Sequence, residues 1–296
     1  MLDSILFILS TTLMYSAPLI FAAIGGVLSE NTGVVNIGLE GMMAFGAFVG
    51  AATTSLCGNP WIGLGAAGMA GLLLALLHAW ASIHMAANQV VSGIAINFLG
   101  TGLSVFACRI LFEGSTMTPP IPLENKIPPL FFGQYATVYL ALGLVFFTHI
   151  FLYKTIWGPR WRAVGEHPKA AESVGINVYQ IRYLAVLASG FCAGLGGASL
   201  SIAVVSSFRP TLIAGQGFIA LAAVIFGRWR PMGAMWAALL FGASQALVVF
   251  VGGQAAIEIS SQILSMLPYL LTLLILVFMN KKSAAPKANG ISYQRN

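Results

Sequence analysis

The segment ILFILSTTLMYSAPLIFAAIGGVL, residues 5–28, carries no charged side chain along its whole length. A helix needs about 20 apolar residues to cross the hydrocarbon core of a bilayer, so this segment is long enough. It is preceded by Asp3 and by no basic residue, unlike the apolar core of a cleaved signal peptide. We therefore expect the first membrane span here.

The rest of the chain has the same apolar character. Hydrophobic residues make up 58% of the 296 residues and charged residues 7%, whereas a soluble chain is about one quarter charged. So few charges cannot cover a water-facing surface, and continuous apolar runs in lipid favour helices. We predict an all-α polytopic membrane protein with about nine transmembrane helices, one of them short enough to be a half-helix (212–227). The expected spans are 5–28, 34–56, 62–84, 88–112, 130–153, 184–204, 212–227, 233–252 and 263–280.

The net charge of +6 comes from basic residues that lie mostly in three short segments between apolar runs. This distribution is typical of cytoplasmic loops beside anionic lipid, and it gives no reason to expect a nucleic-acid partner. With the C-terminus inside and the N-terminus outside, only Arg109, Lys126 and Arg209 lie outside. The basic residues then inside, which include a cytoplasmic tail at 281–296, are Lys154, Arg160, Arg162, Lys169, Arg182, Arg228, Arg230, Lys281, Lys282, Lys287 and Arg295.

The two halves of the chain resemble each other weakly. IGLEGMMA at 37–44 matches IAGQGFIA at 213–220, and each motif follows a pair of glycines. Within one transmembrane domain (1–296), residues 1–112 would form a first repeat and residues 184–280 a second. An odd number of spans between them makes the repeats inverted across the membrane, which is typical of transporters.

The longest polar loop lies between the fifth and sixth expected spans. Within it, Pro168 occupies the position of a first helical residue and Gly175 that of a C-terminal cap. We expect a helix of about two turns with a small apolar face made of Ala170, Ala171 and Val174. Such a face can dock another protein, but a solvated loop with a membrane-surface helix would account for the same residues.

The motif AAxxxG in this loop, between GEHPK (165–169) and INVYQIRY (176–183), resembles the coupling-helix segment of ATP-binding-cassette (ABC) importer permeases. Further motifs resemble the nucleoside and simple-sugar branch of the branched-chain-amino-acid/ribose-type permeases, which includes guanosine-type importers. The resemblance runs from near residue 10 to the C-terminus. Its motifs, in order, are GVVNIGLEGMMAFGAF (33–48), NQVVSGIAIN (88–97), RAVGEHPKAAESVGINVYQIRY (162–183), GQGFIALAAVIFGRWRPMGA (215–234) and APKANGISY (285–293).

The resemblance implies the permease subunit of a nucleoside importer in a bacterial cell membrane, with simple sugars or another small polar solute as the alternative substrate. It also implies a separate ATPase that binds ATP and Mg, a second related permease chain forming a heterodimer, and an extracytoplasmic substrate-binding lipoprotein. The short outer loop 113–129 departs from the family pattern. Residues 154–183 would be the cytoplasmic coupling loop. The ATPase-coupling residues would be Gly165, Glu166, His167, Pro168, Lys169, Ala170, Ala171, Gly175 and Asn177.

Polar residues inside the expected spans are the candidates for a substrate pathway. On a helix that begins near residue 34, Asn36, Glu40 and Met43 share one stripe. Glu40 either hydrogen-bonds a ribose hydroxyl or caps the backbone N–H groups of a half-helix, and we favour the cap. An amide-lined path suits an uncharged polar solute. The pathway candidates are Asn36, Glu40, Asn97, Gln216 and Gln245.

We predict no catalytic residue and no metal site. The chain lacks a G-x-x-x-x-G-K-[ST] loop, so any ATP would be bound by another chain. His78 and His84 lack the i, i+4 spacing of metal-binding helices, and no Ser-His-Asp or Cys-His arrangement is visible. The alternative of a different class is an ion-coupled secondary transporter that uses Glu40, but it leaves the coupling-type loop unexplained.

Overall fold

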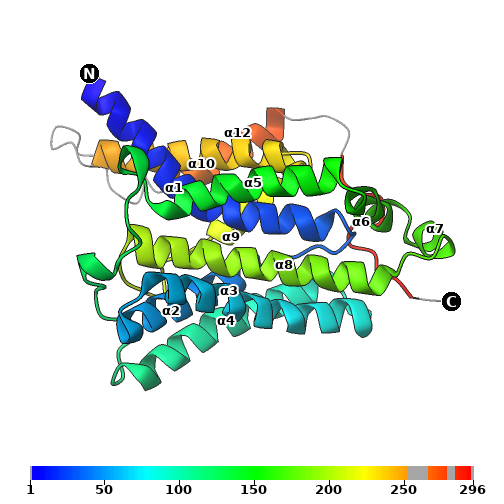
Figure 1. The fold of residues 1–296 in the computed structure, drawn as a ribbon, viewed down its shortest axis with the longest axis horizontal. Helices are drawn as coiled ribbons and strands as arrows, with labels where there is room; N and C mark the ends of the chain where they lie inside the picture. Colours follow the sequence, from blue (N-terminus) through cyan, green and yellow to red (C-terminus); the bar gives the residue numbers. More distant parts are fainter. Residues whose placement is uncertain (1, 253–265, 279–283, 295–296) are drawn as a thin grey trace.

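A computed structural model describes residues 2–252, 266–278 and 284–294 of the chain (Figure 1). In these ranges all regular structure is helical, apart from an isolated β-bridge between Pro129 and Tyr135. The long helices run roughly along one axis, with the N-terminus at one end of the bundle and the C-terminus at the other (Figure 1). The all-α prediction is confirmed for the described residues.

The α-helices are α1 (Leu2–Glu30), α2 (Leu39–Cys57), α3 (Pro60–Ala79), α4 (Gln89–Leu111), α5 (Ala136–Lys154), α6 (Trp157–Glu166), α7 (Pro168–Ser173), α8 (Val178–Ala198), α9 (Gln216–Phe226), α10 (Pro231–Gly252) and α12 (Leu267–Phe278). A π-helical segment extends α3 (Trp80–His84), and a second one extends α8 (Ser199–Val204). Two 3-10 turns, Leu123–Asn125 and Phe131–Gly133, lie in the long loop before α5.

Among the described residues, 6 helices are long and apolar enough to cross a membrane, namely α1, α3, α4, α5, α8 and α10. They coincide with six of the nine expected spans. The expected second span is α2, which has 19 residues but carries Glu40 in its first turn and two threonines. The expected half-helix is the 11-residue α9, and the last span is represented by 12 described residues of α12. The multi-pass architecture is therefore confirmed, whereas the described residues do not establish the number nine.

Helix α8 lies at the centre of the bundle, against α1, α2 and α3. Its close approach to these neighbours depends on glycine. A Cβ atom on Gly46 would lie 2.5 Å from the Cα of Gly194, and one on Gly190 would lie 2.5 Å from the carbonyl oxygen of Gly71. Small residues of this kind let transmembrane helices pack with their backbones in contact.

The beginning of α2 differs from the prediction. Residues 31–38 are not helical, and α2 begins at Leu39 instead of near residue 34. Asn36 therefore lies in the connecting segment, and the predicted helical stripe of Asn36, Glu40 and Met43 is wrong.

Side chains from other helices explain why residues 31–38 do not need to be helical. The backbone N–H of Val35 donates to Oε1 of Gln89 at 2.8 Å, and Nδ2 of Asn97 donates to the carbonyl of Ile37 at 3.0 Å. Buried backbone groups must find partners, and these amides provide them outside a helix. Sequence periodicity alone does not reveal such long-range partners.

The loop between α5 and α8 contains more helix than predicted. Helix α6 was not expected, and α8 begins at Val178 instead of near residue 184. Helix α6 is anchored by Trp161, which is buried and whose Nε1 donates to the carbonyl of Leu28 at 2.9 Å. This contact with the end of α1 is again a tertiary one.

The predicted short helix is α7, and its two ends are confirmed. Pro168 is its first residue. At the other end, the N–H of Gly175 donates to Glu172 O at 2.8 Å and the N–H of Ile176 donates to Ala171 O at 3.1 Å. This pair of bonds is a Schellman motif, which requires the left-handed backbone that Gly175 adopts (φ +84°).

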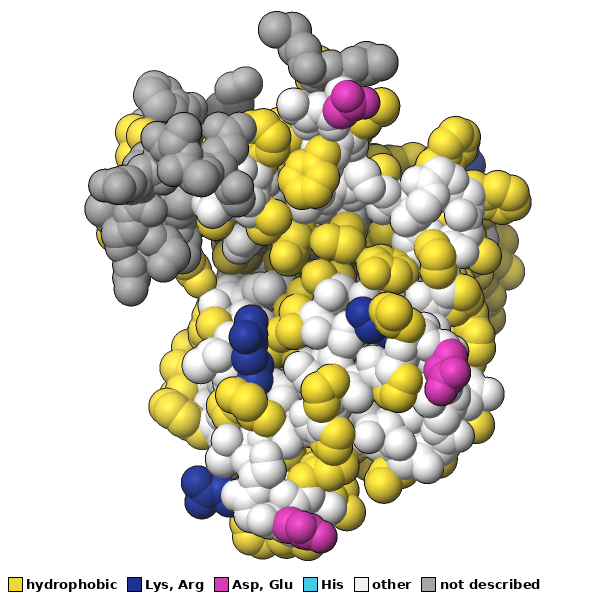
Figure 2. Space-filling model, turned by 90° about the vertical axis from the view of Figure 1, so that its left-hand side faces the viewer, with side chains coloured by type: hydrophobic (Ala, Val, Ile, Leu, Met, Phe, Trp, Pro, Cys, Tyr) yellow, Lys and Arg dark blue, Asp and Glu magenta, His cyan; other side chains and the backbone are white. Residues whose placement is uncertain are grey.

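The loops gather at the two ends of the bundle. We call one the α7 end; it contains α6, α7, residues 31–38, the turn 227–230 and the C-terminal residues 284–294 (Figure 1). We call the other the loop end; it contains the start of α1 and residues 112–135 and 205–209. Figure 2 looks onto the loop end, where hydrophobic side chains cover much of the surface and charged ones are scattered.

Candidate pathway and docking surface

Glu40, the second residue of α2, points at the N-terminus of α9. Its Oε1 accepts a hydrogen bond from Gly215 N at 2.6 Å, and its Oε2 accepts one from Gly217 N at 2.7 Å. The first N–H groups of a helix have no partner within the helix, and the positive end of the helix dipole favours a carboxylate. Glu40 therefore caps the half-helix α9, which is the role that we favoured, and both of its oxygens are engaged in the cap.

Two further pathway candidates hold the beginning of α2 in place. Asn97, on α4, accepts a hydrogen bond from Gly41 N at 2.8 Å while its Nδ2 binds the segment before α2. Asn36 is fully buried, and its Nδ2 donates to Oγ of Ser189 on α8 at 2.9 Å. These amides therefore join the broken start of α2 to α4 and α8.

The remaining two candidates differ in position. Gln216 is the first residue of α9, half-buried between the two glycines that Glu40 binds. Gln245 is half-buried on α10, which packs mainly on α1 and α9, and no hydrogen bond between described residues joins it to the others. The structure thus gathers four of the five candidates where α2 and α9 begin, and leaves Gln245 apart.

The residues assigned to ATPase coupling do not form one surface. Ala171 is 3% exposed and faces the bundle, whereas Ala170 is exposed and Val174 is 75% exposed. The predicted apolar face of these three residues is therefore wrong, because the bundle covers Ala171 while Ala170 and Val174, which follows the last residue of α7, are exposed. Gly165 is also buried, since a Cβ there would lie 2.2 Å from Asn31 O. Pro168 is half-buried, and the exposed members are Glu166, His167, Lys169, Ala170, Gly175 and Asn177.

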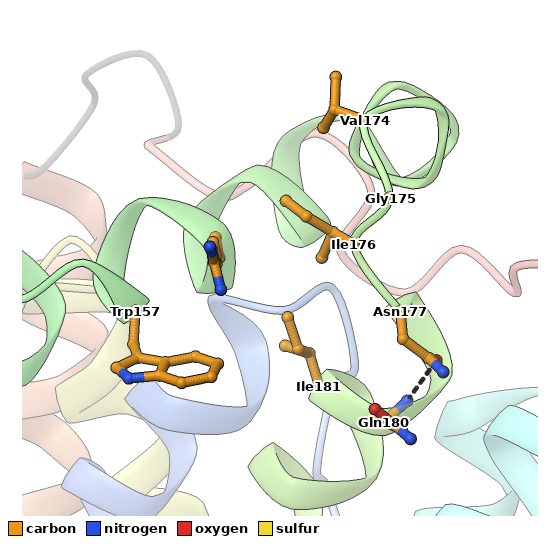
Figure 3. A pocket seen from close by; sticks show the side chains of 8 residues that line it. Trp157, Val174, Gly175, Ile176, Asn177, Gln180 and Ile181 are labelled. Carbon is orange, nitrogen blue, oxygen red and sulfur yellow. Dashed lines mark hydrogen bonds between the residues drawn. The ribbon is translucent and has the colours of Figure 1, made fainter.

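A hollow of about 430 Å³ opens beside the end of α7 (Figure 3). Trp157 lies on the α6 side, and Asn177 and Gln180 lie on the α8 side, where Asn177 Oδ1 accepts a hydrogen bond from Gln180 N at 3.1 Å. The lining combines apolar, amide and basic groups: Trp157, Arg160, Val174, Gly175, Ile176, Asn177, Gln180 and Ile181. This mixture is typical of a surface that contacts another protein.

Sequence reasoning missed two buried charges at the α7 end. Arg182 is 1% exposed and Glu30 is 4% exposed. The sequence places Arg182 on the cytoplasmic side without indicating that it is buried, and it indicates no role for Glu30. Arg182 lies inside the motif INVYQIRY (176–183), and the structure packs the motif APKANGISY (285–293) against it. The presence of these two motifs is the sequence signal that could have indicated a buried contact for Arg182.

Among the described residues, no three His, Cys, Asp or Glu side chains lie close enough together to share a metal ion. His78 instead contacts Oγ of Ser92 at 3.0 Å and the carbonyl of Val35 at 3.2 Å. It therefore helps to hold the segment that leads into α2.

Comparison with known proteins decides the family. The model of the family described as branched-chain amino acid transport system / permease component matches residues 8–278. The chain belongs to this permease family. The permease is 44% identical to the guanosine ABC transporter permease protein NupQ of Bacillus subtilis and 41% identical to the nucleoside ABC transporter permease protein NupC of Lactococcus lactis subsp. cremoris. Each alignment covers 97% of this permease and 96% of the relative.

A third relative has a different name. The putative glucose ABC transporter permease protein TsgC13 of Haloferax volcanii is 36% identical, over 97% of both chains. All three relatives are named as permease proteins of ABC transporters. The chain is therefore a multi-pass permease subunit and not an enzyme, and its family implies a separate ATPase and a substrate-binding protein.

Proposed function

We propose that this permease is the membrane-spanning subunit of an importer that takes up nucleosides by alternating access, driven by a separate ATPase that binds ATP and Mg. The observation that carries the substrate is the identity of 44% and 41%, over 97% of the chain, to permeases named for guanosine and for nucleosides. Similarity over this share of the chain includes the segments where α2 and α9 begin.

The chemistry at the start of α2 and α9 supports an uncharged solute. Both oxygens of Glu40 are bound by backbone N–H groups, so this carboxylate is engaged in holding α9. The side chains left for contact with a solute are amides, above all Gln216 and Gln245. Amides can hydrogen-bond sugar hydroxyls and base edges, and an engaged carboxylate disfavours proton or sodium coupling through Glu40.

We assign the hollow beside α7 and the exposed residues around it to the ATPase. Val174 stands exposed at its edge, Trp157 provides an apolar wall, and Arg160 provides a positive charge. The residues that we expect to touch the ATPase are Glu166, His167, Lys169, Ala170, Gly175 and Asn177. Gly165 and Ala171 would act from inside, by holding α7 against the bundle.

This assignment makes the α7 end cytoplasmic. The described residues of that end include eight basic side chains and three acidic ones, as the positive-inside rule requires. They are Lys154, Arg160, Arg162, Lys169, Arg182, Arg228, Arg230 and Lys287, with Glu30, Glu166 and Glu172. The N-terminus would then lie outside, nine spans would cross the membrane, and the binding lipoprotein would approach the loop end.

We further propose that residues 1–112 and 184–280 are inverted repeats. Helices α1 and α8 run in opposite directions through the bundle (Figure 1). Each is followed by a helix, α2 or α9, that begins after a non-helical segment, with Glu40 and Gln216 at corresponding positions. A second related permease chain would complete the pathway.

Simple sugars are the second candidate substrate, because a relative named as a putative glucose permease is 36% identical over 97% of the chain. A nucleoside carries a ribose, so one set of amides could serve either solute. Uptake of each solute when it is supplied separately distinguishes them.

The test is uptake into vesicles that contain this permease, its sister permease, the ATPase and the binding protein. Radiolabelled guanosine, uridine and glucose are supplied separately, with ATP present or absent and with ionophores that collapse proton and sodium gradients. We expect guanosine or uridine to accumulate only with ATP, and the ionophores to have no effect. ATP-dependent uptake of glucose alone would replace the substrate assignment, and gradient-driven uptake without ATP would overturn the importer assignment.

A further inference from the structure

The C-terminal residues 284–294, which we call the tail, fold back onto the α7 end and bind residues far from them in the sequence. The N–H of Ala288 donates to Gly165 O, at the end of α6, at 2.8 Å. The N–H of Gly290 donates to Gly33 O, after α1, at 3.2 Å. The tail is therefore paired by its backbone to two separate parts of the bundle.

The tail also provides partners for the two buried charges. Arg182 Nη1 donates to Ile291 O at 3.2 Å, while its Nε donates to Thr32 O at 3.1 Å. Glu30 Oε2 accepts a hydrogen bond from Asn289 Nδ2 at 3.1 Å. A buried charge is costly unless it is hydrogen-bonded, so these bonds fix the tail at a defined place.

The last described part of the tail reaches α7. The hydroxyl of Tyr293 donates to Oε2 of Glu172, and the side chain of Tyr293 is 7% exposed. Its ring lies 5.8 Å from the ring of Tyr179, and the Cζ of Arg182 is 5.8 Å from its centroid. Both are residues of α8, so Tyr293 connects α7 with the start of α8.

Helix α7 needs such a contact because it has only 6 residues. A helix this short is not stable on its own, because nucleation is unfavourable and few hydrogen bonds follow it. Its inward contact is made by the single methyl group of Ala171. The bond from Tyr293 to Glu172 adds a polar attachment to this small apolar one.

We propose that the tail is a clasp that positions α7, with Tyr293 as the positioning residue. Movement of α7 would then reach α1, residues 31–38 and α9 through the tail, in addition to α6 and α8, to which α7 is joined covalently. The proposal rests on the proposed function only for the source of the movement, the ATPase. The clasp itself is a property of the permease.

The contacts beyond the tail continue toward the pathway candidates. Glu30, held by Asn289, also accepts a hydrogen bond from Trp229 Nε1 at 2.5 Å, in the turn between α9 and α10. The segment 31–38, held by Arg182 and the tail, leads directly to Glu40, which caps α9. Both ends of the half-helix are therefore connected to the clasp by hydrogen bonds or by a few residues of chain.

The first test measures hydrogen exchange in the full-length permease in lipid nanodiscs. Tyr293→Phe removes only the hydroxyl and keeps the ring on Arg182. We expect the amides of Ala171, Gly175 and Ile176 to exchange about tenfold faster, because one hydrogen bond to a charged group is lost. The matched control is Tyr139→Phe, which removes the hydroxyl bond to Phe131 O at the loop end and leaves exchange in α7 unchanged.

The second test reads the positioning role in vesicles with the complete transporter. For Tyr293→Phe we expect the number of ATP molecules hydrolysed per nucleoside imported to rise at least about threefold, since α7 moves without carrying α1 and α9. Glu172→Gln keeps an acceptor for the Tyr293 hydroxyl but loses the charge, so its ratio is expected to lie between those of wild type and Tyr293→Phe.

The outcomes separate the clasp from the proposed function. Unchanged α7 exchange in both Tyr293→Phe and Tyr293→Ala overturns the clasp, and faster exchange with an unchanged ATP-to-nucleoside ratio overturns the positioning role. A third outcome is that Tyr293→Phe keeps the wild-type fold and exchanges faster in α7, while the wild-type permease binds no ATPase. This outcome overturns the proposed function and leaves the clasp supported.

Discussion

The two ends of the bundle use charge in opposite ways. At the loop end the described charged residues are three acids and three bases, and most of them are exposed: Asp3, Glu113, Glu124, Arg109, Lys126 and Arg209 (Figure 2). At the α7 end, Arg182 and Glu30 are buried and bound to three separate parts of the chain, namely residues 31–38, the turn 227–230 and the tail. Charge at the loop end is solvated, whereas these two buried charges at the α7 end join segments together.

Hydrogen bonds between distant residues occur at both ends. At the loop end, Ile121 N donates to Ser206 O at 2.8 Å and joins residues 112–135 to residues 205–209. At the α7 end, the tail binds residues more than one hundred positions away, and two of its bonds are made to buried charges. An end that receives movement from a partner must move as one body, and bonds to buried charges hold its segments together. The comparison therefore predicts larger effects of charge removal at the α7 end than at the loop end.

The largest effect on stability is expected for Arg182→Ala. The change leaves Thr32 O without its donor and opens a cavity, so the free energy of unfolding should fall by about 3 kcal/mol. Titration of the purified permease with a denaturing detergent measures it. Arg109→Ala is the control at the loop end, where the midpoint should not move. Equal losses in the two variants would remove the distinction between the ends.

A smaller loss is expected for Glu40→Ala, which removes the cap of α9. Loss of two hydrogen bonds at a helix N-terminus should lower the free energy of unfolding by about 2 kcal/mol, and Glu40→Gln, which keeps one acceptor, by about half of that. The same titration gives the stabilities. In vesicles, Glu40→Gln should retain ATP-dependent uptake that ignores ionophores; a new dependence on a proton gradient would favour the secondary-transporter alternative.

The smallest loss is expected for Trp229→Phe. The ring remains packed, but Glu30 loses one of its two donors, so we expect a decrease of about 1 kcal/mol. Combining it with Asn289→Ala should cost more than the sum of the single changes, because Glu30 then has neither donor. A strictly additive double mutant would show that Glu30 does not join the tail to the turn between α9 and α10.

The sequence was sufficient for features that depend on local composition. Apolar runs predicted the six long helices, two glycines predicted the short α9, and Pro168 and Gly175 predicted both ends of α7. It was insufficient where distant residues decide the backbone. The start of α2 is set by hydrogen bonds with Gln89 and Asn97, and the position of α6 is set by the contact of Trp161 with Leu28. The periodicity of the sequence reveals neither set of contacts.

The candidate site was predicted in part: the neighbouring helices of the pathway residues were expected, whereas the orientation and burial of residues near α7 were not. Glu40 and Gln216 were paired from a weak repeat, and the structure brings their helices together. The predicted face of Ala170, Ala171 and Val174 was wrong because packing covers Ala171 alone, while Val174 lies just after α7 and is exposed. The burial of Arg182 was not predicted, because its partner Ile291 lies in the tail, more than one hundred positions away.

The central claim is that the α7 end receives the ATPase, and one matched pair of variants tests it. Gly175 and Gly133 both have positive φ and no neighbour within 4 Å of an added Cβ, and they lie at opposite ends. Each change to Arg should cost about 1 kcal/mol in backbone strain, so the two variants are expected to be equally stable and equally well inserted.

The measurement is the amount of ATPase that co-purifies with each variant from membranes containing the complete transporter. We predict that Gly175→Arg loses the ATPase, because its side chain projects from the hollow beside α7, and that Gly133→Arg retains it. Full retention of the ATPase by Gly175→Arg, or equal loss in both variants, would contradict the assignment of the α7 end.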